Sequence, residues 1–313
     1  MKHSIKSIVV SVGFLAATGG TVLAQTTVYS DDFTSDSALS STYLNMNSVG
    51  SSDAWAFTAD TQLQLQTAGS SKLDEVLNGF NAVTLGSAGQ YITMTVNFNS
   101  GGSIVNNFAQ AGGAGNLLMA FANSGGVALG GGSTPEAESS TANTGQTHGD
   151  VSYAGMLALN TTPKTSSKFF VKTASGLNGV AYSSDSTPTT QLASESANYA
   201  FSGSDNYTLT YTLTYVSATQ LTVSDILTDD TGTPTQEANS FTVNTASATT
   251  PTLTLDTFDF GLYTGSETAG YDLNITDFNV VTTGSIAPSP EPSVLALGAA
   301  GVGLLGLIRR RRS

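Results

Sequence analysis

The residues that could do acid–base chemistry in this chain are few, and their spacing fits no familiar catalytic arrangement. Beyond the first 24 residues the only histidine is His148. A histidine base needs an activated nucleophile and a separate orienting acid, and Asp150 stands too near in sequence to be recognised as that acid. Gly-x-Ser-x-Gly and His-Glu-x-x-His patterns do not occur. We therefore expect a solvated loop histidine and no catalytic residues.

Carboxylates paired for glycoside hydrolysis are not recognisable by local spacing either. Asp256 and Asp259 differ by three positions, so on a regular strand they point to opposite faces. Glu75 falls in a segment expected to be helical. The other glutamates ahead of Glu291 lie in segments of loop-like composition: Glu136, Glu138, Glu195, Glu237 and Glu267. The chain is therefore expected not to be an enzyme, and the alternative is a polysaccharide-active hydrolase or lyase that uses dispersed carboxylates.

Two pairs of aspartates could offer oxygen atoms to calcium. Asp229 and Asp230 precede Thr231-Gly232, and Asp31 and Asp32 precede Phe33. Calcium prefers such ligands, but Asp-x-x-Gly is equally ordinary turn chemistry. We favour turns at both places, and so predict no metal site and no cofactor, with calcium as the alternative.

Trp55 is the single tryptophan of the chain, and it is a candidate ligand contact. With Phe57 two residues later, it could form a platform for a sugar ring at the edge of a sheet. Residues at i and i+2 share one face of a strand, so a core position is the favoured interpretation.

The composition limits what the 313-residue chain can bind. Charged residues make up 11%, under half of the roughly 25% usual for soluble domains. There is no cysteine, which excludes disulfides and thiolate sites. The net charge of −13 argues against nucleic acid as a partner. Between residues 25 and 290, four basic residues stand against 22 acidic ones, a balance of 4 − 22 = −18.

Residues 1 to 24 are expected to form a secretory signal peptide. Lys2, His3 and Lys6 precede an apolar run of about ten residues, half of what a spanning helix needs. The segment ends with a small residue, Ala24, as is typical of a cleavage site. Signal peptidase is therefore expected to cut between Ala24 and Gln25.

The opposite end of the chain is expected to be a membrane-spanning segment followed by basic residues that stop its transfer. Residues 293 to 308 are apolar or small, and as a helix would reach about 24 Å, short of the roughly 30 Å hydrocarbon core. Arg309, Arg310, Arg311 and Arg312 follow and are expected to stay cytoplasmic, which places the preceding chain across the membrane.

Pro290, Glu291 and Pro292, the apolar segment and the terminal arginines together resemble the PEP-CTERM sorting signal of bacteria. The resemblance covers residues 288 to 313 only. It implies that the tripeptide is recognised by an exosortase-type enzyme, which removes the helix and passes the protein to the cell surface or an exopolysaccharide matrix.

Between the two ends, apolar residues recur at period two, as in half-solvated antiparallel strands. Clear examples are 62–66, 91–98 and 207–215, and residues 207–215 with 220–227 are the best hairpin candidate. Further strands are expected at 26–33, 80–85, 117–121, 151–159, 169–173, 241–244, 253–263 and 271–281. The one helix candidate is 71–79.

About a dozen short strands with polar turns predict an all-β, two-sheet antiparallel sandwich. The order of features from Asp31-Asp32-Phe33 through Trp55 to a last strand at 273–280 resembles concanavalin A-like, LamG-type jelly rolls. That resemblance implies pairing of the first strand, 27–33, with the last, 272–281.

The expected organisation is a signal helix (1–24), a β-sandwich domain (25–284), a linker with the sorting motif (285–292), a single transmembrane helix (293–308) and a basic cytoplasmic tail (309–313). The chain is expected to pass through the inner membrane to the cell surface or matrix. Its role there would be structural, adhesive or weakly glycan-binding, with extracellular polysaccharide as a candidate partner.

Overall fold

The computed structural model describes residues 23–33, 43–48, 54–58, 62–66, 73–100, 115–123, 136–138, 151–158, 167–172, 189–195, 206–231, 235–244, 253–264 and 272–287. Over these residues every regular element is a β-strand. In the same ranges no helix is long and apolar enough to cross a membrane. The expected membrane segment, the sorting motif and nearly all of the signal peptide lie outside them.

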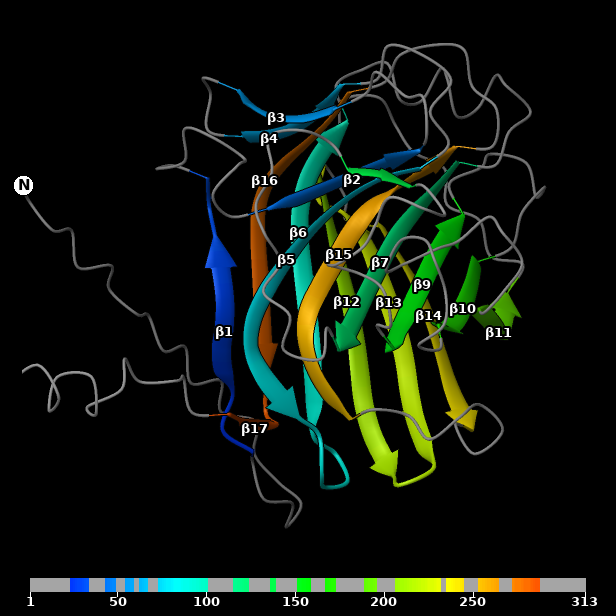
Figure 1. Ribbon diagram of the computed structural model, residues 1–313. Helices are drawn as coiled ribbons and strands as arrows, with labels where there is room; N and C mark the ends of the chain where they lie inside the picture. Colours follow the sequence, from blue (N-terminus) through cyan, green and yellow to red (C-terminus); the bar gives the residue numbers. More distant parts are fainter. Residues whose placement is uncertain are drawn as a thin grey trace, which may run out of the picture.

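The strands form two sheets that pack face to face (Figure 1). Sheet A has the order β14-β13-β12-β6-β16-β4-β3, with β1 also paired to β16. Its strands are β1 (Thr26–Asp31), β3 (Ala54–Thr58), β4 (Gln62–Gln66), β6 (Tyr91–Ser100), β12 (Asn206–Ser217), β13 (Gln220–Asp229), β14 (Thr235–Asn244) and β16 (Asp272–Thr282).

Sheet B has the order β11-β10-β9-β7-β15-β5-β2-β8, with β17 also paired to β5. Its strands are β2 (Leu44–Ser48), β5 (Leu73–Thr84), β7 (Gly115–Asn123), β8 (Glu136–Glu138), β9 (Val151–Ala158), β10 (Ser167–Lys172), β11 (Thr189–Glu195), β15 (Thr254–Thr264) and β17 (Ser285–Ile286). All described pairings are antiparallel except β2 with β8. In Figure 1, β5 and β15 curve in front of β6 and β12.

The predicted two-sheet antiparallel sandwich is confirmed, as are the hairpin of β12 with β13 and the pairing of the first strand with the last. β17 continues sheet B into the segment expected as a linker. Trp55 lies on the edge strand β3, opposite Leu65 of β4. His148 lies outside the described residues.

The helix predicted at 71–79 is wrong, because β5 begins at Leu73. Lys72 to Leu77 is rich in helix-forming residues, but local preference is weak and tertiary pairing overrides it. Here β5 is hydrogen-bonded to β15 along one edge and to β2 along the other. A helix in its place would leave both neighbours without backbone partners.

Among the side chains that the structure describes, the core between the sheets is formed by one face of strands such as β6, β12, β15 and β16. Phe98 of β6 stacks on Tyr207 of β12, with ring centroids 5.6 Å apart. Phe258 of β15 packs against Phe278 of β16 at 5.2 Å, which joins the two sheets. Because the chain has no cysteine, no disulfide contributes to stability, and apolar contacts of this kind hold the two sheets together.

Gly155 of β9 makes room for a tyrosine that crosses between the sheets. A Cβ at this position would lie 2.9 Å from Tyr211 Cε2, 3.2 Å from Met119 Cγ and 3.3 Å from Phe169 Cε1. Tyr211 extends from β12 and donates its hydroxyl hydrogen to the Tyr153 carbonyl oxygen at 3.0 Å. The glycine therefore allows a buried polar bond from one sheet to the other.

Substituting Gly155→Ala is expected to lower the free energy of unfolding by about 1–3 kcal/mol, because the added methyl overpacks this contact. Urea unfolding of the variant measures the loss. Gly86→Ala is the matched control, since no atom lies within 4 Å of its Cβ position, and its change is expected to stay within about 0.5 kcal/mol. Equal losses in the two variants would contradict this account.

Candidate functional site

The outer face of sheet A carries short hydroxyl and amide side chains where the neighbouring strands β12, β6 and β16 alternate in phase. In β6, Ile92, Met94 and Val96 are buried while Thr93 and Thr95 face outward. The register of β6 with β12 sets Thr93 opposite Thr212 and Thr95 opposite Thr210. On the other edge of β6, β16 sets Val281 opposite Thr93 and Asn279 opposite Thr95.

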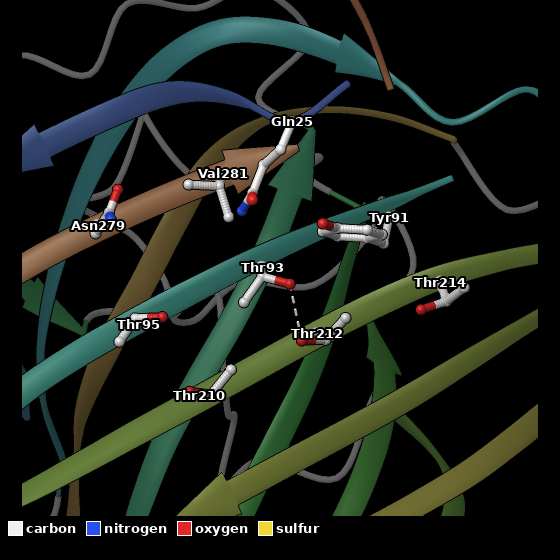
Figure 2. Close-up of a pocket in the computed structure, with 9 residues that line it drawn as sticks. All are labelled: Gln25, Tyr91, Thr93, Thr95, Thr210, Thr212, Thr214, Asn279 and Val281. Atoms are coloured by element: carbon white, nitrogen blue, oxygen red, sulfur yellow. Dashed lines mark hydrogen bonds between the residues drawn. The ribbon is translucent and has the colours of Figure 1, made fainter. Parts of the chain in front are cut away.

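This face contains an open hollow of ≈ 410 Å³, which we call the threonine hollow. Its lining residues come from the segment ahead of β1 and from β6, β12 and β16: Gln25, Tyr91, Thr93, Thr95, Thr210, Thr212, Thr214, Asn279 and Val281. Figure 2 shows them spread over neighbouring strands, with Tyr91 at one end. None of these nine residues is an Asp, Glu, Lys, Arg or His.

The hydroxyl groups of the hollow are only partly used within the protein. Thr93 Oγ1 and Thr212 Oγ1 share a hydrogen bond of 2.9 Å, drawn as a dashed line in Figure 2. Within the described residues, the hydroxyls of Thr95, Thr210 and Thr214 make no hydrogen bond to protein. Each can therefore donate to and accept from a bound molecule or water.

The same face becomes acidic further along β16. Asp277 is half-buried and its Oδ2 accepts a hydrogen bond from Asn97 Nδ2 at 3.4 Å. Burial raises the pKa of Asp277 above its usual value, and the nearby negative charges of Asp32 and then Asp31 raise it further. Anions are thus disfavoured at this end of the face.

The two aspartate pairs considered for calcium both make turn-type hydrogen bonds. Asp31 Oδ1 accepts from the backbone N–H of Phe33 at 2.9 Å, which holds Phe33 at a positive φ of 55°. Asp229 Oδ1 accepts from the N–H of Thr231 at 2.8 Å. Among the described residues, no group of three or more His, Asp or Glu side chains could hold a metal ion.

Asp31 also anchors a buried tyrosine cluster. Its Oδ2 accepts from Tyr43 Oη at 2.9 Å and from Tyr29 Oη at 3.3 Å, and the two hydroxyls are themselves hydrogen-bonded. Asn78 Nδ2 of β5 donates to Tyr29 Oη at 2.9 Å. Burial is the main cause that raises the pKa of both tyrosines, so both stay protonated at neutral pH. The cluster ties β1 to sheet B and is structural.

A second acidic feature, which the sequence analysis missed, lies on sheet B. Glu75 of β5 and Asp259 of β15 are both buried, and each alternates with core residues such as Val76 and Phe260. Both therefore point away from the core, on one face. Asp259 is opposite Leu77 and Glu75 is opposite Gly261, so the two carboxylates are diagonal neighbours. The helix expected around Glu75 concealed this pairing.

The other residues predicted as sites are placed as follows. Ala24 and Gln25 are exposed just ahead of β1. The side chain of Trp55 is outside the described set, although its strand is within it. The sorting tripeptide Pro290, Glu291 and Pro292 and the arginines at 309–312 lie wholly outside the described residues.

Comparison with known proteins gives structural likeness only. No family model matches the chain, and no curated protein matches it. A solved structure of peanut lectin with a nine-residue peptide is similar at 15% identity and a TM-score of 0.43, over 85% of this chain and 99% of that one. Winged bean acidic lectin complexed with methyl-α-D-galactose gives 11% identity and 0.45, over 82% and 98%.

An alginate lyase, Aly36B, in complex with an alginate tetrasaccharide gives 11% identity and a TM-score of 0.39, over 80% of this chain and 99% of that one. All three TM-scores are below 0.5. The likeness therefore goes no further than the two-sheet arrangement already described.

The raised pKa of Asp277 predicts a pH-dependent cost to stability. A carboxyl with a higher pKa in the folded state destabilises the fold once it ionises, so stability falls as pH rises from the ordinary value of 3.8 through the raised one. Asp277→Asn should therefore raise the free energy of unfolding at neutral pH. Urea unfolding of both proteins across the acidic pH range measures this difference in the free energy of unfolding. The difference should vanish at a pH low enough for Asp277 to be protonated in both the folded and the unfolded protein. A gain that persists at the lowest pH would contradict this cause.

Proposed function

We propose that this protein is an exported surface or matrix protein whose sandwich domain binds a neutral glycan weakly at the threonine hollow. The observation that carries the proposal is the lining of that hollow: hydroxyls, two amides and one aromatic ring, with no charge. A structural or adhesive role then follows from attachment of the domain to extracellular polysaccharide.

The chemistry of the lining suits a sugar. Threonine hydroxyls and the amides of Asn279 and Gln25 both donate and accept, as sugar hydroxyl groups do. The ring of Tyr91 offers an apolar surface with a polar tip. The hollow is open, so it buries only part of a ligand, and weak affinity is the expected result.

The charge of the domain supports a neutral ligand over an anionic one. The segment from 25 to 290 carries 4 − 22 = −18, and Asp277 with Asp31 and Asp32 makes one end of the face acidic. Like charges repel an anionic polymer from such a surface. A neutral polysaccharide has no such barrier.

Export and sorting form the second half of the proposal. The signal peptide at 1–24 and the sorting motif at 290–292 support passage to the cell surface or matrix through signal peptidase and an exosortase-type enzyme. The exposed stretch Leu23 to Gln25 ahead of β1 is compatible with cleavage there. A concanavalin A-like jelly roll remains part of the proposal, supported by the pairing of β1 with β16.

A polysaccharide-active enzyme is the second candidate, favoured by the diagonal pair of Glu75 and Asp259. Glycoside hydrolysis uses a pair of carboxyl groups that flank the scissile bond, and these two lie on one face of sheet B. Their complete burial weighs against it, because a catalytic carboxyl must reach its substrate. Release of new reducing ends or unsaturated sugars, abolished by Glu75→Gln in a folded variant, would establish the enzyme.

The hollow is tested in two ways: by removing hydroxyl groups with little change of shape, and by removing the aromatic ring. Thr95→Val with Thr210→Val, which lie opposite each other, and separately Tyr91→Ala, are expected to weaken binding to a neutral polysaccharide by roughly two- to tenfold. Each lost hydrogen bond costs about 0.5–1.5 kcal/mol. A neutral-glycan array finds the ligand, and isothermal titration with an oligosaccharide of that ligand measures the change.

The matched control is Thr222→Val with Thr242→Val. These residues share a hydroxyl hydrogen bond of 3.2 Å on β13 and β14 of the same sheet, outside the hollow. The protein with both control substitutions is expected to bind the neutral glycan as tightly as the unaltered protein does. If both double variants lose affinity alike, or if no neutral glycan binds the unaltered protein, the proposed role of the hollow is wrong.

A further inference from the structure

Gln25 joins the expected export signal to the threonine hollow. It stands immediately ahead of β1, is exposed, and lines the hollow beside Val281. Figure 2 shows its side chain extending toward the other lining residues. The expected cut after Ala24 would make this glutamine the first residue of the exported chain.

The new terminus would be held at the hollow by backbone pairing. Thr26 pairs with Thr282 and Thr27 pairs with Val281 at the end of β16. Gln25 is therefore one residue from the first register pair and cannot move far from the lining. Whatever chemical group the terminus carries becomes part of the surface that a ligand meets.

We propose that Gln25 is converted to pyroglutamate after export, so that a lactam ring forms one wall of the threonine hollow. This inference rests on the export half of the proposed function. The neutral α-amino nitrogen attacks the side-chain Cδ, an N–Cδ bond forms, and the Cδ–Nε2 bond breaks. The nitrogen's proton leaves with the amide as ammonia, so the step needs no oxidant, reductant or other co-reactant.

The local structure permits this ring to form. Gln25 is exposed, and among the described residues its side chain makes no hydrogen bond that would hold it away from its own backbone nitrogen. The register with β16 begins at Thr26, so closing the ring breaks no pairing of the sheet. An α-amine has an ordinary pKa of about 7.7–8.0, so a neutral fraction is present near pH 7.

The ring changes what the hollow can bind. An uncyclised terminus would place an ammonium group among nine otherwise uncharged side chains and would attract anionic ligands. The lactam removes that charge and presents one N–H and one C=O in fixed geometry. The hollow then matches a neutral glycan along its whole lining.

The test is the intact mass and amino-terminal peptide of the full chain after export from a bacterial host. The expected amino-terminal peptide begins at residue 25 and resists Edman degradation. Its mass is lower, by one ammonia, than that of the same peptide with an unmodified Gln25. Pyroglutamate aminopeptidase should open it to a chain that begins at Thr26. Gln25→Ala is the control, and its terminus should keep the full mass and a free amine.

Two results would overturn the inference. One is a chain that begins at Gln25 and keeps its ammonia after prolonged incubation at neutral pH; the other is a chain that begins elsewhere. The first leaves export intact, whereas the second also contradicts the expected cleavage. Glycan binding is measured apart from both, so a failure at the hollow is distinguishable from a failure at the terminus.

Discussion

The hydrogen bonding of β16 along both of its edges is the constraint on which the rest of sheet A depends. One edge is filled by β6. The other is shared, because β4 pairs with its first residues and β1 with its last. A central strand cannot leave backbone groups unpaired without a large cost, so the first strand of the domain is drawn to the last. This brings Gln25, Asn279 and Val281 into one surface.

Strict alternation made several strands predictable from sequence, whereas the first half of β5 was predicted as a helix. Gln62–Gln66 and Tyr91–Ser100 show period two because one face is buried and the other is wet. β5 lacks that signal at residues 75–78 because both faces of the strand are buried there, with Glu75 and Leu77 on one face and Val76 and Asn78 on the other. Its helix-like composition then misleads, and only the pairing with β15 and β2 decides its conformation.

The candidate sites also divide into those that neighbouring residues in the sequence predict and those that depend on how the strands pair. Turn chemistry at Asp31 and Asp229 is local and was recognisable from neighbouring residues. The threonine hollow joins residues far apart in the chain, such as Thr93 and Thr212, and no short motif records that contact. The Asp259–Glu75 diagonal is likewise a property of register. Sequence patterns identify which face a threonine occupies, but not which strand lies beside it.

The positions of the strands along the chain also decide when the threonine hollow can form during folding. β12 and β13 are adjacent along the chain and can pair as soon as both are made, whereas Gln25 meets Val281 only when β16 has been made and has paired with β1. A chain in which β16 has not yet paired therefore has no complete threonine hollow. A ligand that contacts the whole lining therefore has no complete site until β16 is in place.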